Sequence, residues 1–255
     1  MMTFSIVPGA VVTGNIEQQK QKQQQYRSIL PEQGGLEDLA LPVVHQGTLP
    51  ICTGVAAANA RMILQYQQTG QLIPFSGLFI YKMNRLFDGL PREQKGSTLE
   101  ASMQTLSCKG VCLERLYPSN QYNCQKPFPA NGKHLLQNAL SYRILQYQRC
   151  DTLSEILFQL SNQHPVAFSM IISTDFYQAQ RGIVSAERQG ERIGGHSMVA
   201  IGYDLKRELV KVLQSWGRSK HGPTADGYMY IPFSWFDMID PLTEHSLLIE
   251  AFALS

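Results

Sequence analysis

Apolar side chains recur at a helical spacing in the first half of the chain. From Val55 onward they return every three or four residues, while Arg61, Gln65 and Gln68 fall on the opposite side. This is the spacing of an amphipathic helix. Cys52 stands three residues before Val55, so we expect it in the first turn of that helix.

Two more helices are expected before residue 130. The apolar run 76–86 predicts the first of them. Ser97 and Glu100 have the spacing of a capping box, in which two side chains satisfy backbone N–H groups at a helix start. They predict a helix that closes at Gly110, because glycine is common just after a helix C-terminus.

Strands dominate the second half. A strand expected over 143–147 is followed by a short helix that Thr152 and Glu155 cap. Further apolar runs predict strands over 165–172, 196–203, 209–214, 228–231 and 247–254. Helices early and antiparallel strands late predict an α+β fold with a helical lobe, a β lobe and a site in the cleft between them.

The N-terminal 40 residues differ from the rest. Residues 15–27 are polar and rich in glutamine, with almost no apolar face. Such a tract is typical of a flexible extension, or of a pro-segment-like element that lies across the rest of the protein. We therefore divide the chain into an extension, 1–40, and an organised domain, 41–255. Within it, 41–130 is expected to be mainly helical and 131–255 mainly β.

Composition excludes several classes of protein. The chain has 255 residues, of which 16% are charged, and a formal charge of +2. No basic run stands out, so nucleic acid is not an expected partner. No apolar run approaches the roughly 18 residues of a membrane helix, and residues 1–8 lack the basic start of a secretory signal. We expect a cytoplasmic protein, one exported by a leaderless route, or one whose sequence has lost its leader.

The five cysteines do not have the spacing of a metal site. They include no CxxC pair and no nearby histidine at ligand spacing. Two disulfides among Cys108, Cys112, Cys124 and Cys150 would leave Cys52 as the free thiol, and five free thiols in a reducing compartment fit equally well. Neither a metal nor an organic cofactor is expected.

Cys52 is the candidate nucleophile. At a helix start, unpaired N–H groups and the positive end of the helix dipole favour the thiolate, which is the nucleophilic form. Gln46, six residues earlier, supplies a neutral donor for an oxyanion beside the sulfur. A buried cysteine at such a place is more often a small core residue, so this hypothesis needs a base elsewhere.

His196 is the candidate base. Gly194 and Gly195 leave its imidazole approachable where a buried strand begins, and Gln214 and Trp216 close the next strand. An amide oxygen that accepts from one imidazole nitrogen leaves the other nitrogen facing the sulfur. A lone histidine or tryptophan here would usually be structural, but their combination with the cysteine favours nucleophilic catalysis.

Three blocks of this sequence resemble the signatures of the papain-like cysteine peptidases, the C1 family, in a bacterial-looking form. The blocks are Gln46-Gly47 with Cys52, the run 195–204, and the run 214–217 followed by Asp226-Gly227-Tyr228. Gly96-Ser97, Tyr117-Pro118 and the run 162–166 match in addition. The resemblance covers roughly residues 41–254.

The resemblance implies a papain-like two-lobe fold, with a helical left lobe, a β-barrel-like right lobe and the active-site cleft between them. It implies that Cys52 attacks a peptide carbonyl and that His196, oriented by Gln214, forms an ion pair with it and then protonates the leaving amine. The Cys52 N–H and Gln46 would bind the oxyanion. The substrate-binding residues would be Gly96, Ser97, Gly195 and Trp216.

The sequence departs from the family at three places. Family members usually carry asparagine where this chain has Gln214, an aromatic residue often stands at the position of Thr53, and no cysteine closely precedes Cys52 to form the usual disulfide of the first lobe. Only the first departure concerns catalysis. Because orienting the base is a supporting role, we expect attenuation rather than loss, and a Gln214→Asn variant at least as active as the parent chain.

Three functions fit these residues. The first is an endopeptidase that acts on extended polypeptides through a Cys-His acyl-enzyme. The second is a papain-fold acyltransferase or deamidase, and the third is a catalytically impaired papain-fold binding protein. Retention of Cys52, His196 and Gln46 together favours the first. Self-inhibition by the extension, 1–40, is a further hypothesis.

Overall fold

The structure is a computed structural model that describes residues 29–36, 39–89, 95–130, 132–218, 224 and 227–255. The Gln-rich tract 15–27 lies outside the described residues, so its predicted role as a flexible or inhibitory segment stays a prediction. Among the described residues, no helix combines the length and apolar character that crossing a membrane requires.

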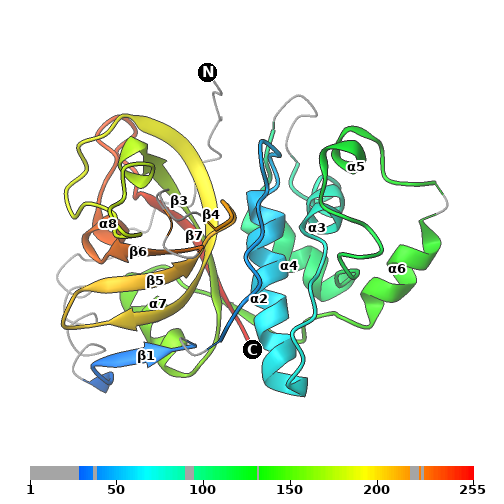
Figure 1. Ribbon diagram of the computed structural model, residues 1–255, viewed down its shortest axis with the longest axis horizontal. Helices are drawn as coiled ribbons and strands as arrows, with labels where there is room; N and C mark the ends of the chain where they lie inside the picture. Colours follow the sequence, from blue (N-terminus) through cyan, green and yellow to red (C-terminus); the bar gives the residue numbers. More distant parts are fainter. Residues whose placement is uncertain (1–28, 37–38, 90–94, 131, 219–223, 225–226) are drawn as a thin grey trace.

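The protein has a helical lobe and a β lobe, and the long helix α2 is the part of the helical lobe that faces the sheet (Figure 1). The helical lobe comprises α2 (Cys52–Thr69), α3 (Gly77–Asn84), α4 (Leu99–Cys108), α5 (Gln121–Gln125) and α6 (Lys133–Leu140). The β lobe comprises β1 (Gln33–Gly35), β2 (Tyr147–Arg149), β3 (Val166–Ser173), β4 (Arg192–Asp204), β5 (Leu209–Leu213), β6 (Tyr228–Pro232) and β7 (Leu248–Leu254), with α7 (Leu153–Ser161), the short 3-10 helix η1 (Thr174–Phe176) and α8 (Ser234–Asp237). The predicted α+β fold with two lobes is confirmed.

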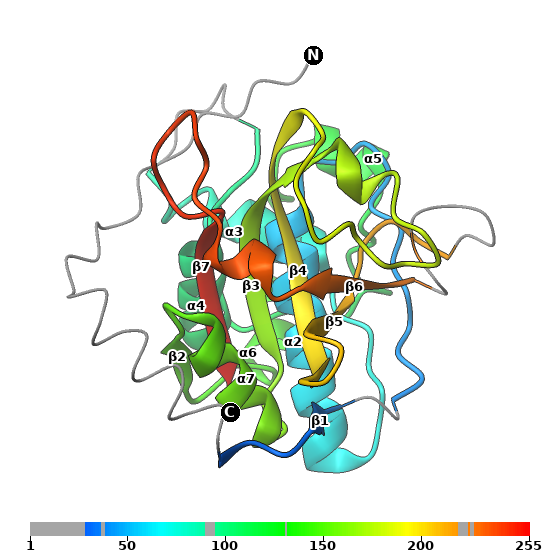
Figure 2. The same cartoon turned by 90° about the vertical axis from the view of Figure 1, so that its left-hand side faces the viewer.

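The strands form one antiparallel sheet in the order β2-β7-β3-β4-β5-β6, and β1 pairs with β4 (Figure 2). Successive side chains of a strand point to opposite faces of the sheet. On β4, Val199 and Ile201 join the core shared with the helices, while Met198 and Ala200 join the core inside the β lobe. This alternation decides which β4 side chains meet α2.

Helix α2 is buried on nearly every side, unlike the amphipathic helix expected from the sequence. Arg61 and Gln65, expected on its polar face, are both buried. The Arg61 Nε donates to the Tyr142 carbonyl at 3.1 Å and its guanidinium lies over the Phe75 ring. The helix keeps polar residues because neighbouring loops supply partners for them.

Helix starts were predicted with mixed success. The capping box of Thr152 and Glu155 is confirmed at α7. At α4 the predicted box was wrong: Thr98, with an extended backbone, is the N-cap and accepts from the Ala101 N–H, so Ser97 lies outside the helix. The N-cap needs that backbone conformation together with an acceptor side chain, and spacing alone does not identify it.

Some elements were missed. The expected strand over 143–147 begins only at Tyr147, and α6 lies in a part of the chain expected to be mainly β. Strand β1 falls inside the segment assigned to the extension, yet it pairs with β4. This part of the segment therefore belongs to the sheet.

A carboxylate joins the two lobes. Glu250 on β7 accepts the N–H of Leu99 at 2.6 Å and of Glu100 at 3.1 Å, both in the first turn of α4. A carboxylate at a helix N-terminus satisfies unpaired donors and complements the helix dipole. Burial nevertheless raises the pKa of Glu250, although these two N–H donors oppose the shift.

The raised pKa of Glu250 predicts a pH dependence of stability. The folded state binds a proton on this carboxyl more readily than the unfolded chain does. The stability that Glu250 contributes through this proton is therefore fully present below the pKa of the group in the unfolded chain. It is lost as pH rises through the pKa of the group in the folded protein. We expect Glu250→Gln to remove this decline in urea unfolding measured from about pH 4 to about pH 8. Glu187→Gln, which removes an exposed carboxylate, is the control and should keep the decline; identical curves for all three proteins would contradict the assignment.

Close contact between α2 and α3 predicts a cost for any side chain at Gly54. A Cβ on Gly54 would lie 2.1 Å from the Gly77 carbonyl oxygen, so the two helices would have to separate. We expect Gly54→Ala to lower the free energy of unfolding by about 3 kcal/mol, at the upper end of overpacking effects. Gly70→Ala, where a Cβ meets no atom within 4 Å, should cost about 1 kcal/mol from left-handed strain alone. Equal losses in urea titrations would show that the contact is not limiting.

Candidate active site

Cys52 occupies the first turn of α2, as predicted, and the residue is half-buried. Burial raises the pKa of its thiol, and hydrogen bonding to the amide and hydroxyl of Ser197 and to the Thr53 amide opposes that shift. The N–H groups at the helix start do lower the thiol pKa, as expected, but desolvation outweighs them and the net shift is upward.

His196 and Gln214 are in direct contact. The His196 Nε2 lies 2.9 Å from the Gln214 Oε1, and both side chains are buried. Strand β4 carries the histidine and the residue after β5 carries the glutamine, so sheet pairing brings them together. The longer side chain reaches the imidazole, and the extra methylene does not prevent the bond.

One aromatic ring covers the imidazole, and a second ring stacks on the first. Trp216 stacks on His196 with ring centroids 4.9 Å apart, and Tyr177 stacks on Trp216 at 5.1 Å. Burial lowers the pKa of His196 to about 4, and the Gln214 hydrogen bond opposes the shift. The neutral imidazole therefore dominates at neutral pH as long as no opposite charge lies beside it.

Thiol and imidazole share one electrostatic constraint. A thiolate alone and an imidazolium alone are each disfavoured by burial. Proton transfer from the thiol to the imidazole would create both charges at once, and their attraction would offset part of the desolvation cost.

Gln46 lies beside the strand end that carries Gln214. Its backbone N–H donates to the Ser215 carbonyl at 2.9 Å, and its side-chain oxygen accepts from the Ser215 hydroxyl. Its Nε2 donates to the Leu49 carbonyl at 2.8 Å, which uses one of the two amide hydrogens. The side chain is thus held in place with one N–H left for another acceptor.

The residues expected to bind substrate lie on both lobes. Gly96 and Ser97 precede α4, and the Gly96 carbonyl accepts from Arg85 Nη1 at 3.3 Å. Gly195 on β4 is half-buried and pairs with Ile171 of β3. Trp216 is half-buried over the histidine. Their binding of substrate stays a prediction.

Several contacts around these residues were not predicted from the sequence. Ser197 stood unremarked inside a motif, although its place directly after the histidine was a signal. Tyr177 gave no signal, because 39 residues separate it from Trp216 and only the fold stacks the rings. All five cysteines are free thiols, and no cluster of side chains suited to a metal ion occurs in the described part of the chain.

Comparison with known proteins extends these observations. A family profile described as papain family cysteine protease matches residues 43–235. An uncharacterized peptidase C1-like protein of Acanthamoeba polyphaga mimivirus is 27% identical over 208 residues, which cover 77% of this chain. The match spans only 66% of the viral protein's length.

Two solved structures share the fold. Xylellain, a cysteine protease from Xylella fastidiosa, superposes with a TM-score of 0.76 at 19% identity, covering 99% of this chain and 91% of its own. The Carica candamarcensis cysteine protease CMS1MS2, solved in complex with E-64, gives 0.65 at 18% identity, covering 89% and 99%. The family profile spans well over half of the sequence. The chain belongs to the papain family of cysteine proteases.

Proposed function

We propose that this protein is a cysteine endopeptidase that hydrolyses extended polypeptides through an acyl-enzyme on Cys52. The observation that carries the proposal is the bond between His196 Nε2 and Gln214 Oε1. It leaves the Nδ1 nitrogen as the base for a thiol whose sulfur lies against Ser197, the next residue along β4. Both solved relatives are named cysteine proteases, and one holds E-64.

Acylation needs a proton to move twice. The Cys52 thiol gives its proton to His196 Nδ1, and the sulfur attacks the peptide carbonyl carbon. The imidazolium then gives that proton to the leaving nitrogen as the C–N bond breaks. Water next attacks the thioester, gives a proton to His196, and releases the carboxylic acid and the free thiol.

The oxyanion formed during attack needs donors. The backbone N–H of Cys52 at the start of α2 is one, and the Nε2 hydrogen of Gln46 that Leu49 does not use is the other. Each such donor contributes about 2.7–4 kcal/mol to transition-state stabilisation in acyl transfer. The Ser215 hydroxyl, which donates to the Gln46 oxygen, orients this amide.

The direction of the two pKa shifts favours one alternative, a papain-fold binding protein without turnover. A neutral thiol beside a neutral imidazole is a poor nucleophile. Reactivity of Cys52 therefore separates the two functions.

We expect Cys52 to react with iodoacetamide or an epoxide at mildly acidic pH faster than the exposed Cys108 does, because only an activated thiol is ionised there. His196→Ala should abolish the preference and lower peptide hydrolysis by about 100-fold or more, the usual contribution of a general base. Mass spectrometry locates the adduct, and Cys108 is the internal control. Labelling of Cys52 no faster than Cys108 would favour the binding protein.

The contacts of the Gln214 amide support a different expectation for Gln214→Asn from the one drawn from the sequence. The amide is buried, its oxygen meets His196 and its nitrogen meets two methionine sulfurs. A side chain one methylene shorter cannot keep all these contacts, so we expect kcat/KM for a peptide substrate to fall about fivefold, the effect of one lost hydrogen bond. Gln137→Asn on the exposed face of α6 is the control. Activity at or above the parent level would restore the earlier expectation.

A further inference from the structure

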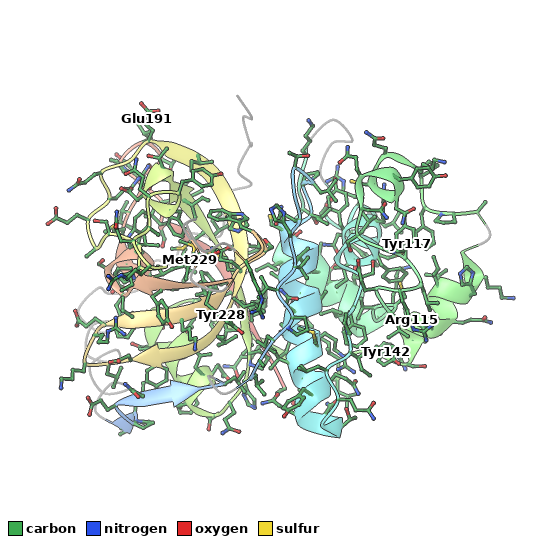
Figure 3. The ribbon with its side chains drawn as sticks, in the orientation of Figure 1. Arg115, Tyr117, Tyr142, Glu191, Tyr228 and Met229 are labelled. Carbon is green, nitrogen blue, oxygen red and sulfur yellow. The ribbon has the colours of Figure 1, made fainter. Side chains whose placement is uncertain are left out.

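The Gln214 amide has three polar contacts, and the protein excludes water from all of them. Its Nε2 lies 2.9 Å from the Met198 sulfur and 3.1 Å from the Met229 sulfur, while its Oε1 lies 2.9 Å from His196 Nε2. Gln214 and Met229 are fully buried and Met198 is nearly so. Figure 3 shows Met229 within the β lobe. No solvent competes for these groups.

A thioether distinguishes the two ends of an amide. Its sulfur carries no hydrogen and acts only as a weak acceptor, whereas an amide nitrogen offers two hydrogens and an amide oxygen offers none. With the nitrogen toward Met198 and Met229, each hydrogen meets one sulfur. With the amide turned over, the oxygen would face two sulfur lone pairs and have no donor, which is costly for a buried group.

We propose that Met198 and Met229 are positioning residues that hold the Gln214 oxygen toward His196 and so select the imidazole tautomer. The oxygen can only accept, so His196 Nε2 must carry the proton, and in the neutral ring Nδ1 is then the acceptor. The catalytic consequence rests on the proposed function, because Nδ1 matters as the base for Cys52. The tautomer itself does not depend on it.

Strands β4, β5 and β6 place Met198, Gln214 and Met229 on one face of the sheet. Met198 follows His196 by two residues on β4 and shares its face. Met229 on β6 pairs with Val212 of β5, two residues before Gln214. Leucine at either methionine position would fill nearly the same volume but would offer no acceptor, so replacement tests the sulfur separately from the packing.

The tautomer is read directly by long-range ¹H–¹⁵N NMR of protein labelled with [¹⁵N]histidine. A Cys52→Ala background at neutral pH keeps His196 neutral and prevents the ion pair, and the His196→Ala spectrum identifies the signal. We expect the Nε2–H form alone in this background and a detectable Nδ1–H form once Met198→Leu and Met229→Leu are added. Met103→Leu, a buried methionine of α4, is the matched control and should leave the tautomer unchanged.

Activity is measured in parallel with Cys52 intact. We expect the double leucine variant to lower kcat for a peptide substrate about fivefold, because the hydrogen bond between Gln214 and His196 loses its preferred direction. KM should stay unchanged, because both methionine side chains are buried away from the substrate. Should the double variant not fold, each single variant is expected to show the same change at a smaller size. An Nδ1–H tautomer with both methionines present, or an unchanged tautomer in folded leucine variants, would overturn the proposal.

The two proposals fail differently. A protein that hydrolyses no peptide and shows no preferential labelling of Cys52 would refute the peptidase, while its His196 tautomer would still decide the role of the sulfurs. Peptide hydrolysis together with an unchanged tautomer and unchanged kcat in the leucine variants would refute only the role of the methionines.

Discussion

Helix α2 packs against helices on one side and against β4 on the other, and this double burial places a sulfur at the boundary of two cores. The helix begins at Cys52, where the chain enters the boundary from the loop that carries Gln46. Contact as close as that between Gly54 and Gly77 leaves the helix little freedom to shift. The position of Cys52 therefore follows from packing more than from any polar contact of its own.

The same burial sets the chemistry of the site. A dry environment opposes each charge separately, raising the thiol pKa and lowering the imidazole pKa. When two opposite charges form together, their attraction offsets part of the desolvation cost. Hydrogen bonds are also stronger where water is absent. Under the proposed function, a proton moving from Cys52 to His196 would cost less than the loss of that proton to solvent.

Sequence sufficed for features governed by local patterns. The helix at Cys52, the cap at Thr152 and the strand that carries His196 each depend on residues close together in the chain. The contact between His196 and Gln214 followed from motif order. The sign of the Cys52 pKa shift did not, because burial depends on both lobes.

Other features depend on contacts that no local pattern encodes. Strand β1 has three residues, two of them glycine. It forms by pairing with the end of β4, residues 202–204, which lies beyond the residues of β4 that pair with β3. Tyr177 reaches Trp216 through the fold. The sulfur of Met229 meets Gln214 because β5 and β6 pair in one register, and a shift by one residue would turn that side chain to the other face.

Trp216 has a second consequence for the histidine that it covers. The indole ring lies nearly parallel to the imidazole, at an interplanar angle of 25°. An aromatic face carries negative quadrupolar charge and attracts a cation placed over it. The ring that keeps water away from the neutral imidazole would therefore also attract the protonated form of the same side chain.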